Sequence, residues 1–338
     1  MAQTFALTTD MPVYVAGHRG LVGSAVWRRL TALGFTNLIG WRSAEVDLTD
    51  RDAAYDALTT ARPAVVVDAA ARVGGILANS TRPVDFLHDN LRIQTNLFDA
   101  AHAADVDRLL FLGSSCIYPK FAEQPIHESA LLTGPLEPTN EAYAIAKIAG
   151  IIGVTAHRHQ YGRRWISAMP TNLYGPGDNF DLNTSHVLPA MIRKFHDAQQ
   201  SGDVVTLWGT GTPRREFLHT DDVATAVVHL LETYDDDSTI NIGTGEDVTI
   251  AELAATIADV VGFTGEVVWD TSKPDGTPRK LLDVSRLRAL GWEPQVSLRD
   301  GIADTYRWYL AQQGQEQQDP AHGQEQAAGA VTAGGAGA

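Results

Sequence analysis

The chain has 338 residues, which is long enough to bury a sizeable core in one large domain or two medium domains. Its 26 Lys and Arg against 41 Asp and Glu give a formal charge of −15, which argues against a nucleic-acid surface or a patch for anionic membranes. The single cysteine excludes an internal disulfide and, without a signal-peptide pattern or an apolar run of about 18 residues, predicts a cytoplasmic protein.

A strand, a glycine-rich turn and a helix are predicted at the start of the chain. Residues 11–16 form a short apolar segment, and residues 24–33 have a helical pattern. The turn between them has the spacing G-x-x-G-x-x-G. Glycines in such a turn let backbone N–H groups approach a pyrophosphate at the start of the helix. We predict that a dinucleotide binds at this turn, which consists of Gly17, His18, Arg19, Gly20, Leu21, Val22 and Gly23.

The second predicted strand, residues 37–41, indicates which dinucleotide binds. An acidic residue near the end of this strand would bind a ribose 2′-hydroxyl, whereas an arginine would suit a 2′-phosphate. Here the strand is followed by Arg42, and Arg19 lies in the glycine-rich turn. These two arginines favour NADP, although Asp47 is close enough to leave NAD open.

Three more apolar segments are predicted as buried strands, at residues 65–67, 109–112 and 165–169, and a long helix is expected over residues 83–103. The alternation predicts an α/β fold with a Rossmann-type parallel sheet and helices on both faces. Ligands of such sheets bind at the carboxyl ends of the strands. The residues expected at this edge are Leu112, Gly113, Ser114, Ser115 and Cys116 after one strand, and Pro170, Thr171, Asn172 and Leu173 after the next.

A helix predicted over residues 140–160 carries Tyr143 and Lys147, which lie on one face because they are four residues apart. Alone, this spacing is more typical of a solvated helix face. A free tyrosine has a pKa of about 10 and is a poor acid or base at neutral pH. However, a nearby ammonium favours the phenolate, and a hydroxyl such as that of Ser114 can orient a substrate oxygen. Together the three residues predict a reductase site.

After residue 177 the pattern changes, which predicts a smaller substrate-binding α/β domain. His186 is expected to start a helix that runs to about residue 200, and a last helix is expected over residues 298–312. Asp221 and Asp222 are interpreted as a helix cap, and no metal site is predicted. The predicted division is a dinucleotide-binding domain of residues 1–176 with returning segments at 214–245, a substrate domain of residues 177–213 and 246–313, and a disordered low-complexity tail of residues 314–338.

Several longer segments carry a family resemblance. They are residues 17–23, 72–76, 112–120, 137–147, 169–175 and 273–280. With these segments the chain resembles the extended short-chain dehydrogenase/reductase family over residues 12–310, but not in the tail. The match is closer still to members that convert GDP-4-keto-6-deoxymannose to GDP-L-fucose, by epimerisation at C3 and C5 and then NADPH-dependent reduction at C4.

The resemblance implies a role for each reactive residue. Tyr143 would protonate the C4 oxygen, Lys147 would lower the pKa of that tyrosine and hold the nicotinamide ribose, and Ser114 would bind the substrate oxygen. Cys116 and His186 would be the base and acid of the epimerisations, and His186 would also contact the cofactor. A thiol of pKa about 8.5 and an imidazole of about 6.5 both work near neutral pH. Otherwise Cys116 would be a small buried apolar residue and His186 a surface residue.

The implied substrate carries a diphosphate, which requires local cations despite the acidic composition. The residues that match substrate contacts of the family are Lys194, Trp208, Arg215 and Asp275, with Arg214, Arg279 and Lys280 as further candidates. A homodimer is also implied. Two alternatives stay open: another nucleotide-sugar epimerase or dehydratase of this family that recycles bound NAD, and a non-catalytic cofactor-binding regulatory protein. The Cys116–His186 pair argues against a simple 4-epimerase.

Overall fold

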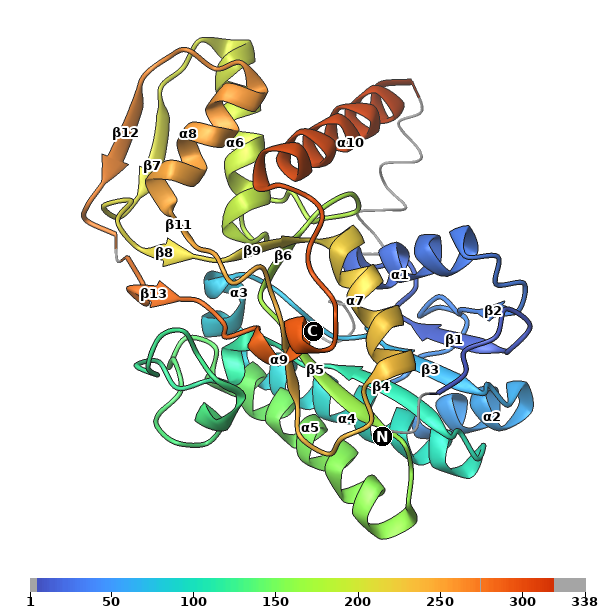
Figure 1. Ribbon diagram of the computed structural model, residues 1–338. Helices are drawn as coiled ribbons and strands as arrows, with labels where there is room; N and C mark the ends of the chain where they lie inside the picture. Colours follow the sequence, from blue (N-terminus) through green and yellow to red (C-terminus); the bar gives the residue numbers. More distant parts are fainter. Residues whose placement is uncertain (1–4, 274, 319–338) are drawn as a thin grey trace.

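The computed structural model describes residues 5–273 and 275–318, and its centre is a six-stranded parallel sheet (Figure 1). The strands lie in the order β10-β5-β4-β3-β1-β2. Their bounds are Val13–Ala16 for β1, Leu38–Ile39 for β2, Val65–Asp68 for β3, Arg108–Leu112 for β4, Ile166–Pro170 for β5 and Ile240–Ile242 for β10. The direction of winding changes between β1 and β3, and open parallel sheets bind ligands beyond the carboxyl ends at such a point.

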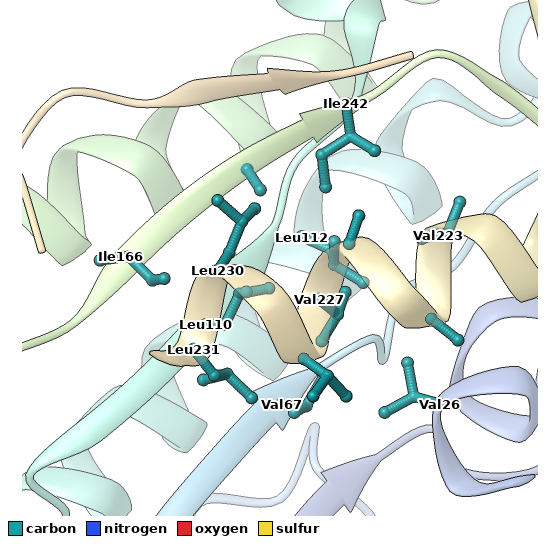
Figure 2. Close-up of a cluster of buried hydrophobic side chains, with 14 of the residues drawn as sticks. Val26, Val67, Leu110, Leu112, Ile166, Val223, Val227, Leu230, Leu231 and Ile242 are labelled. Carbon is teal, nitrogen blue, oxygen red and sulfur yellow. The ribbon is translucent and has the colours of Figure 1, made fainter. Parts of the chain in front are cut away.

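Helices cover both faces of the sheet, which explains why its strands are almost continuously apolar. One face carries α1 (Leu21–Ala32), α7 (Thr220–Thr233) and α9 (Ser285–Ala289). The other carries α2 (Arg51–Ala61), α4 (Pro83–Ala103) and α5 (Glu141–Tyr161), with α3 (Ile76–Thr81) in contact with α4. Figure 2 shows Val227 and Leu230 of α7 beside Leu110 of β4. The predicted fold class is therefore confirmed.

A smaller lobe lies beyond one edge of this sheet (Figure 1). Its core is formed by α6 (Val187–Ser201), α8 (Ile250–Val261) and α10 (Leu298–Gln318), together with the parallel pair β7 (Val205–Trp208) and β12 (Val267–Asp270). The start of α8 is fixed by a capping box between Thr249 and Glu252. α6 and α8 each end at a glycine with positive φ, Gly202 and Gly262.

Short strands connect the lobe to the large sheet. A three-stranded sheet has the order β11-β8-β13, with bounds Val248–Thr249, Arg214–Arg215 and Arg279–Lys280. β6 (Asn172–Tyr174) pairs with β9 (Phe217–His219) in parallel. Only Thr171 separates β6 from β5, so one nearly continuous strand runs from the large sheet into the smaller lobe. Two 3₁₀ turns, η1 (Ser115–Ile117) and η2 (Glu128–Ala130), lie in the connection from β4 to α5.

Three expectations need correction. The strand predicted over residues 165–169 was expected to end there, but β6 follows after Thr171 because its backbone pairs with β9. α10 continues to Gln318, so the predicted tail is wrong for residues 314–318, and residues 319–338 lie outside the described residues. Asp221 and Asp222 do not cap α7. The cap is the His219 side chain, while Asp222 accepts hydrogen bonds from the backbone N–H groups of residues 295 and 296.

Two further observations concern the whole architecture. Leu282 and Val284 pack in one core of the large sheet and Leu287 in the other, so we propose that residues 281–292 also return to the dinucleotide-binding domain. In the part of the chain that the structure describes, no helix combines the length and apolarity needed to cross a membrane.

Candidate active site

The reactive groups begin where β4 ends. The backbone N–H of Gly113 donates to the carbonyl of Ala168 in β5 at 2.9 Å, which holds the chain at the sheet edge. A Cβ at Gly113 would lie 2.4 Å from the end of the Met169 side chain, so a larger residue here would require that side chain to move. The next residue, Ser114, starts η1, and its hydroxyl accepts the backbone N–H of Cys116 at 3.3 Å. Ser114 and Cys116 therefore sit at the carboxyl edge, as predicted.

Tyr143 on α5 reaches the same place. Burial raises the pKa of its phenol above the ordinary value, a thiolate at Cys116 raises that pKa further, and a hydrogen bond with Ser114 opposes the shift. These effects require the three side chains to lie close together, and they keep Tyr143 protonated at neutral pH. The expected lowering of the Tyr143 pKa by Lys147 is therefore wrong for this structure, because burial outweighs the other contributions.

Lys147 is buried one turn further along α5, with only 4 % of its surface exposed. Its Nζ donates to the carbonyl of Leu112 at 2.8 Å and lies 4.7 Å from the centre of the Phe111 ring. Burial lowers the pKa of Lys147 to about 8, and the charge of Asp68 opposes that shift. Sequence reasoning missed Asp68. Burial raises the pKa of this carboxyl to about 6. The signal available in the sequence was a carboxylate directly after the apolar run 65–67. In the structure Asp68 pairs with Phe111 of the neighbouring strand β4.

Lys280 of β13 approaches Cys116, and His186 lies close enough to Lys280 to sense its charge. His186 precedes α6 in extended conformation, and the residue is exposed. Desolvation of the imidazole by neighbouring protein atoms lowers its pKa, and the Lys280 ammonium lowers it further. Lys280 Nζ also lies 3.5 Å from Cys116 Sγ. One ammonium therefore links the two residues that were predicted to epimerise the substrate.

The glycine-rich turn fits an anionic ligand. Gly17 has φ +74°, and a Cβ at Gly23 would lie 2.1 Å from the Gly17 carbonyl oxygen. Gly20 precedes α1 without a side-chain cap, and the first turn of the helix contains no acidic residue. Its N–H groups are thus available to a phosphate.

The side chains around this turn bear on cofactor choice. His18 packs against Trp27, with ring centres 5.2 Å apart, and its buried Nδ1 has no hydrogen-bond partner among the described residues. Arg42 pairs with Glu45 at 2.8 Å, and Arg19 is exposed. The positive charges expected for a 2′-phosphate are present, but the charge of Arg42 is partly neutralised by its ion pair with Glu45.

The segment after β5 lies at the same edge as η1. The backbone N–H of Thr171 donates to the Ile242 carbonyl at 3.0 Å. The Asn172 amide donates to the Glu216 carbonyl at 2.7 Å. These bonds tie the predicted cofactor segment, residues 170–173, to β10 and to the chain between β8 and β9, so its backbone is held firmly.

The predicted substrate residues fall into two groups. Along β7, Lys194 Nζ donates to the Thr206 carbonyl at 3.0 Å, Trp208 is 60 % exposed, and Asp275 accepts the N–H of Thr210 at 2.6 Å. Nearer to Cys116, Arg215 of β8 lies opposite Lys280 of β13. Paired positions in neighbouring strands share a face of the sheet. The second group therefore places two cations side by side.

Known proteins resemble this chain over about nine-tenths of its length. Residues 13–243 match the model of the NAD dependent epimerase/dehydratase family. The chain is 56 % identical to a putative GDP-L-fucose synthase 2 of Arabidopsis thaliana, covering 91 % of this chain and 94 % of the relative. It is 55 % identical to the GDP-L-fucose synthase of Escherichia coli K12, covering 89 % and 97 %. A solved GDP-L-fucose synthetase of Naegleria fowleri bound to NADP is 30 % identical, with a TM-score of 0.84 and coverage of 92 % and 97 %.

Proposed function

The chain belongs to the NAD dependent epimerase/dehydratase family, and from this we propose that it converts GDP-4-keto-6-deoxy-D-mannose to GDP-L-fucose. The reaction is epimerisation at C3 and C5, followed by NADPH-dependent reduction of the C4 ketone. Relatives that share more than half of its residues over about nine-tenths of the chain carry the corresponding name. The observation that carries the proposal is the meeting of Ser114, Cys116 and Tyr143 at one edge of the sheet.

The cofactor is NADP, which supplies a hydride to C4 when bound as NADPH. The glycine turn supports a bound dinucleotide, since Gly17 and Gly23 leave no room for a Cβ and the start of α1 offers free N–H groups. The residues that would hold the cofactor are Gly17, His18, Arg19, Gly20, Leu21, Val22, Gly23, Arg42, Leu112, Gly113, Ser114, Ser115, Lys147, Pro170, Thr171, Asn172, Leu173 and His186. The NADP-bound solved relative supports the same choice.

Epimerisation relies on the acidity of protons next to a ketone. The Cys116 thiolate removes a proton from C3 or C5, so that the C–H bond breaks, an S–H bond forms, and the electron pair moves to the C4 oxygen. His186 returns a proton to the opposite face of the carbon. The hydroxyls of Ser114 and Tyr143 stabilise the negative oxygen by hydrogen bonds.

Reduction uses the same oxygen-binding groups. Tyr143 is protonated at neutral pH because burial raises its pKa, so it can act as the acid that protonates the C4 oxygen. Ser114 holds that oxygen in place. Lys147, one turn after Tyr143 on α5, is fixed by the carbonyl of Leu112 at the end of β4 and provides positive charge near the tyrosine. One set of donors thus serves both reactions.

The nucleotide end of the substrate is assigned to the smaller lobe. We place Arg215 at the diphosphate because a planar guanidinium pairs well with phosphate oxygens. Lys194, Trp208 and Asp275 along β7 complete the predicted substrate contacts. The exposed indole of Trp208 suits stacking on a flat base, and the Asp275 carboxylate accepts hydrogen bonds.

The test is to mix the protein with NADPH and GDP-4-keto-6-deoxymannose and to follow absorbance at 340 nm, with the product identified by NMR. NADPH should be consumed in proportion to GDP-L-fucose formed. Cys116→Ser should slow exchange of the C3 and C5 protons with solvent, whereas Tyr143→Phe should block reduction and retain some exchange. Absence of NADPH consumption by the wild type would instead favour an epimerase or dehydratase that recycles NAD.

We also propose that the enzyme is cytoplasmic and acts as a homodimer. Its single cysteine suits a reducing compartment. The apolar side chains of Ile145 and Ile152 on α5 are 44 % and 52 % exposed and, seven residues apart, lie on one face of the helix. A second copy would cover this face. Light scattering should give twice the chain mass for the wild type and a lower mass for Ile152→Glu, whereas a monomeric wild type would refute the dimer.

A further inference from the structure

Lys280 is fixed beside Cys116 although the two residues are 164 positions apart. The backbone of β13 pairs with β8, and its carboxyl end is held by two more hydrogen bonds. The N–H of Leu281 donates to Gln124 Oε1 at 2.9 Å, and the N–H of Leu282 donates to Glu216 Oε2 at 3.0 Å. The ammonium is therefore delivered by a rigid strand end, with only its own side chain left to adjust.

The buried carboxylate of Glu216 accepts the N–H of Leu282, two residues from Lys280, and the other groups around Lys280 are positive or neutral. Arg215 lies opposite it in β8, His186 faces it from the start of α6, and the phenol of Tyr143 is close to Cys116 from α5. Glu137 faces Arg215 but forms its ion pair with Lys120, at 2.8 Å. Among the described residues no carboxylate forms an ion pair with Lys280, and its hydrogen-bond partner there is the sulfur of Cys116. An ammonium next to a thiol favours the thiolate.

We propose that Lys280 holds Cys116 in the thiolate form that the epimerisation requires. This role rests on the proposed function and adds a positioning residue to it. Lys280 keeps its own proton throughout: the thiolate takes the proton from carbon, the electron pair goes to the C4 oxygen, and His186 supplies the new proton. The same positive charge lowers the pKa of His186, so its imidazolium form is a stronger proton donor to carbon but is less populated.

The first experiment measures the thiolate directly and needs no substrate. Cys116 is the only cysteine of the chain, so iodoacetamide labels one thiol, and the alkylation rate can be followed from pH 6 to pH 10 in the full chain. In Lys280→Met the rate at pH 7 should fall about tenfold, because a neighbouring opposite charge typically favours the charged form by about one pH unit or more. Lys280→Arg should stay near the wild type, and Lys273→Met, an exposed lysine of the same segment, should match it.

Two results would overturn the proposal. One is an alkylation profile of Lys280→Met that coincides with the wild type at every pH. The other is equal loss in Lys280→Met and Lys280→Arg, since a charge effect must survive the conservative change. Circular dichroism of each variant checks that the fold is kept, and Lys280→Gln replaces Lys280→Met if that variant does not fold. Because no GDP-sugar is involved, failure of this experiment is distinguishable from failure of the proposed function.

The second experiment separates the two reactions. In Lys280→Met, deuterium exchange at C3 and C5 should fall about tenfold at pH 7 and recover above about pH 8.5, where a free thiol ionises. Oxidation of GDP-L-fucose by NADP, which reverses the reduction alone, should fall much less than the exchange does at saturating substrate. Equal loss of both activities, or exchange that does not recover at high pH, would mean that Lys280 only binds substrate or maintains structure.

Discussion

Replacing Lys147 by methionine should make the protein more stable at neutral pH while abolishing reduction. The native pKa of Lys147 is about 8 against 10.5 for the free side chain, and burial is the cause. At about 1.4 kcal/mol per pH unit, keeping this ammonium in the fold costs about 3 kcal/mol below pH 8. Methionine removes the charge but loses the hydrogen bond to Leu112, worth about 1 kcal/mol. The expected net gain at pH 7 is about 2 kcal/mol.

The sign of the pH dependence follows from proton counts. Between pH 8 and 10.5 the unfolded chain holds the Lys147 proton and the folded chain releases it, so the wild type gains stability as pH rises. The advantage of Lys147→Met should therefore shrink across this window and be gone near its upper end. Asp68 strengthens this trend. Without the Lys147 ammonium, the ionised and buried Asp68 carboxylate lowers the stability of the variant further as pH rises.

The assay is urea unfolding of the protein without added nucleotide, followed by tryptophan fluorescence at pH 7, 8.5 and 10. Nucleotide is omitted because its binding to the folded state would add stability of its own. Lys273→Met is the matched control and should change the free energy of unfolding by less than about 0.5 kcal/mol. A Lys147→Met variant that is less stable at pH 7, or whose difference from the wild type is constant with pH, would refute the reasoning.

Three other substitutions test separate parts of the structure. Gly23→Ala puts a Cβ 2.1 Å from the Gly17 oxygen and should abolish NADPH binding, measured by fluorescence titration, whereas Gly20→Ala, at 3.3 Å, should weaken it less. Arg42→Ala should raise the KM for NADPH and leave that for NADH unchanged; equal effects would argue against a 2′-phosphate contact. Arg108→Met should lower the free energy of unfolding by about 3–5 kcal/mol, because a buried arginine that binds four backbone carbonyls is lost, with kcat per folded molecule unchanged.

Much of the large sheet was predictable because its signals are local. α4 begins at Pro83, where proline is tolerated in the first turn, and it matches the predicted helix at both ends. Apolar runs such as residues 65–67 can only be buried strands in this setting. By contrast, β8, β11 and β13 have two residues each and exist only through their pairing. No local pattern distinguishes such segments from loops, so the connections of the smaller lobe were missed.

The same difference applies to the site. Ser114, Cys116 and Tyr143 were predictable because they follow or flank one strand and meet at its carboxyl end. The contact of Lys280 with Cys116 depends on the register of β13 against β8, which joins segments about 65 residues apart. Asp68 was missed because a carboxylate at a strand end is usually solvated, and its burial appears only once α5 covers the sheet. Sequence therefore predicted where Ser114, Cys116 and Tyr143 lie better than it predicted the charged groups around them.

The nearly continuous strand from β5 through β6 has a mechanical consequence. A hinge between two lobes needs a few residues that can change their backbone angles freely, and Thr171 is the only residue between these strands. Its N–H and the Asn172 side chain are both tied to neighbouring chain segments. Rotation of the lobes would break these bonds and the β6–β9 pairing. We therefore expect little rotation of the lobes at this connection.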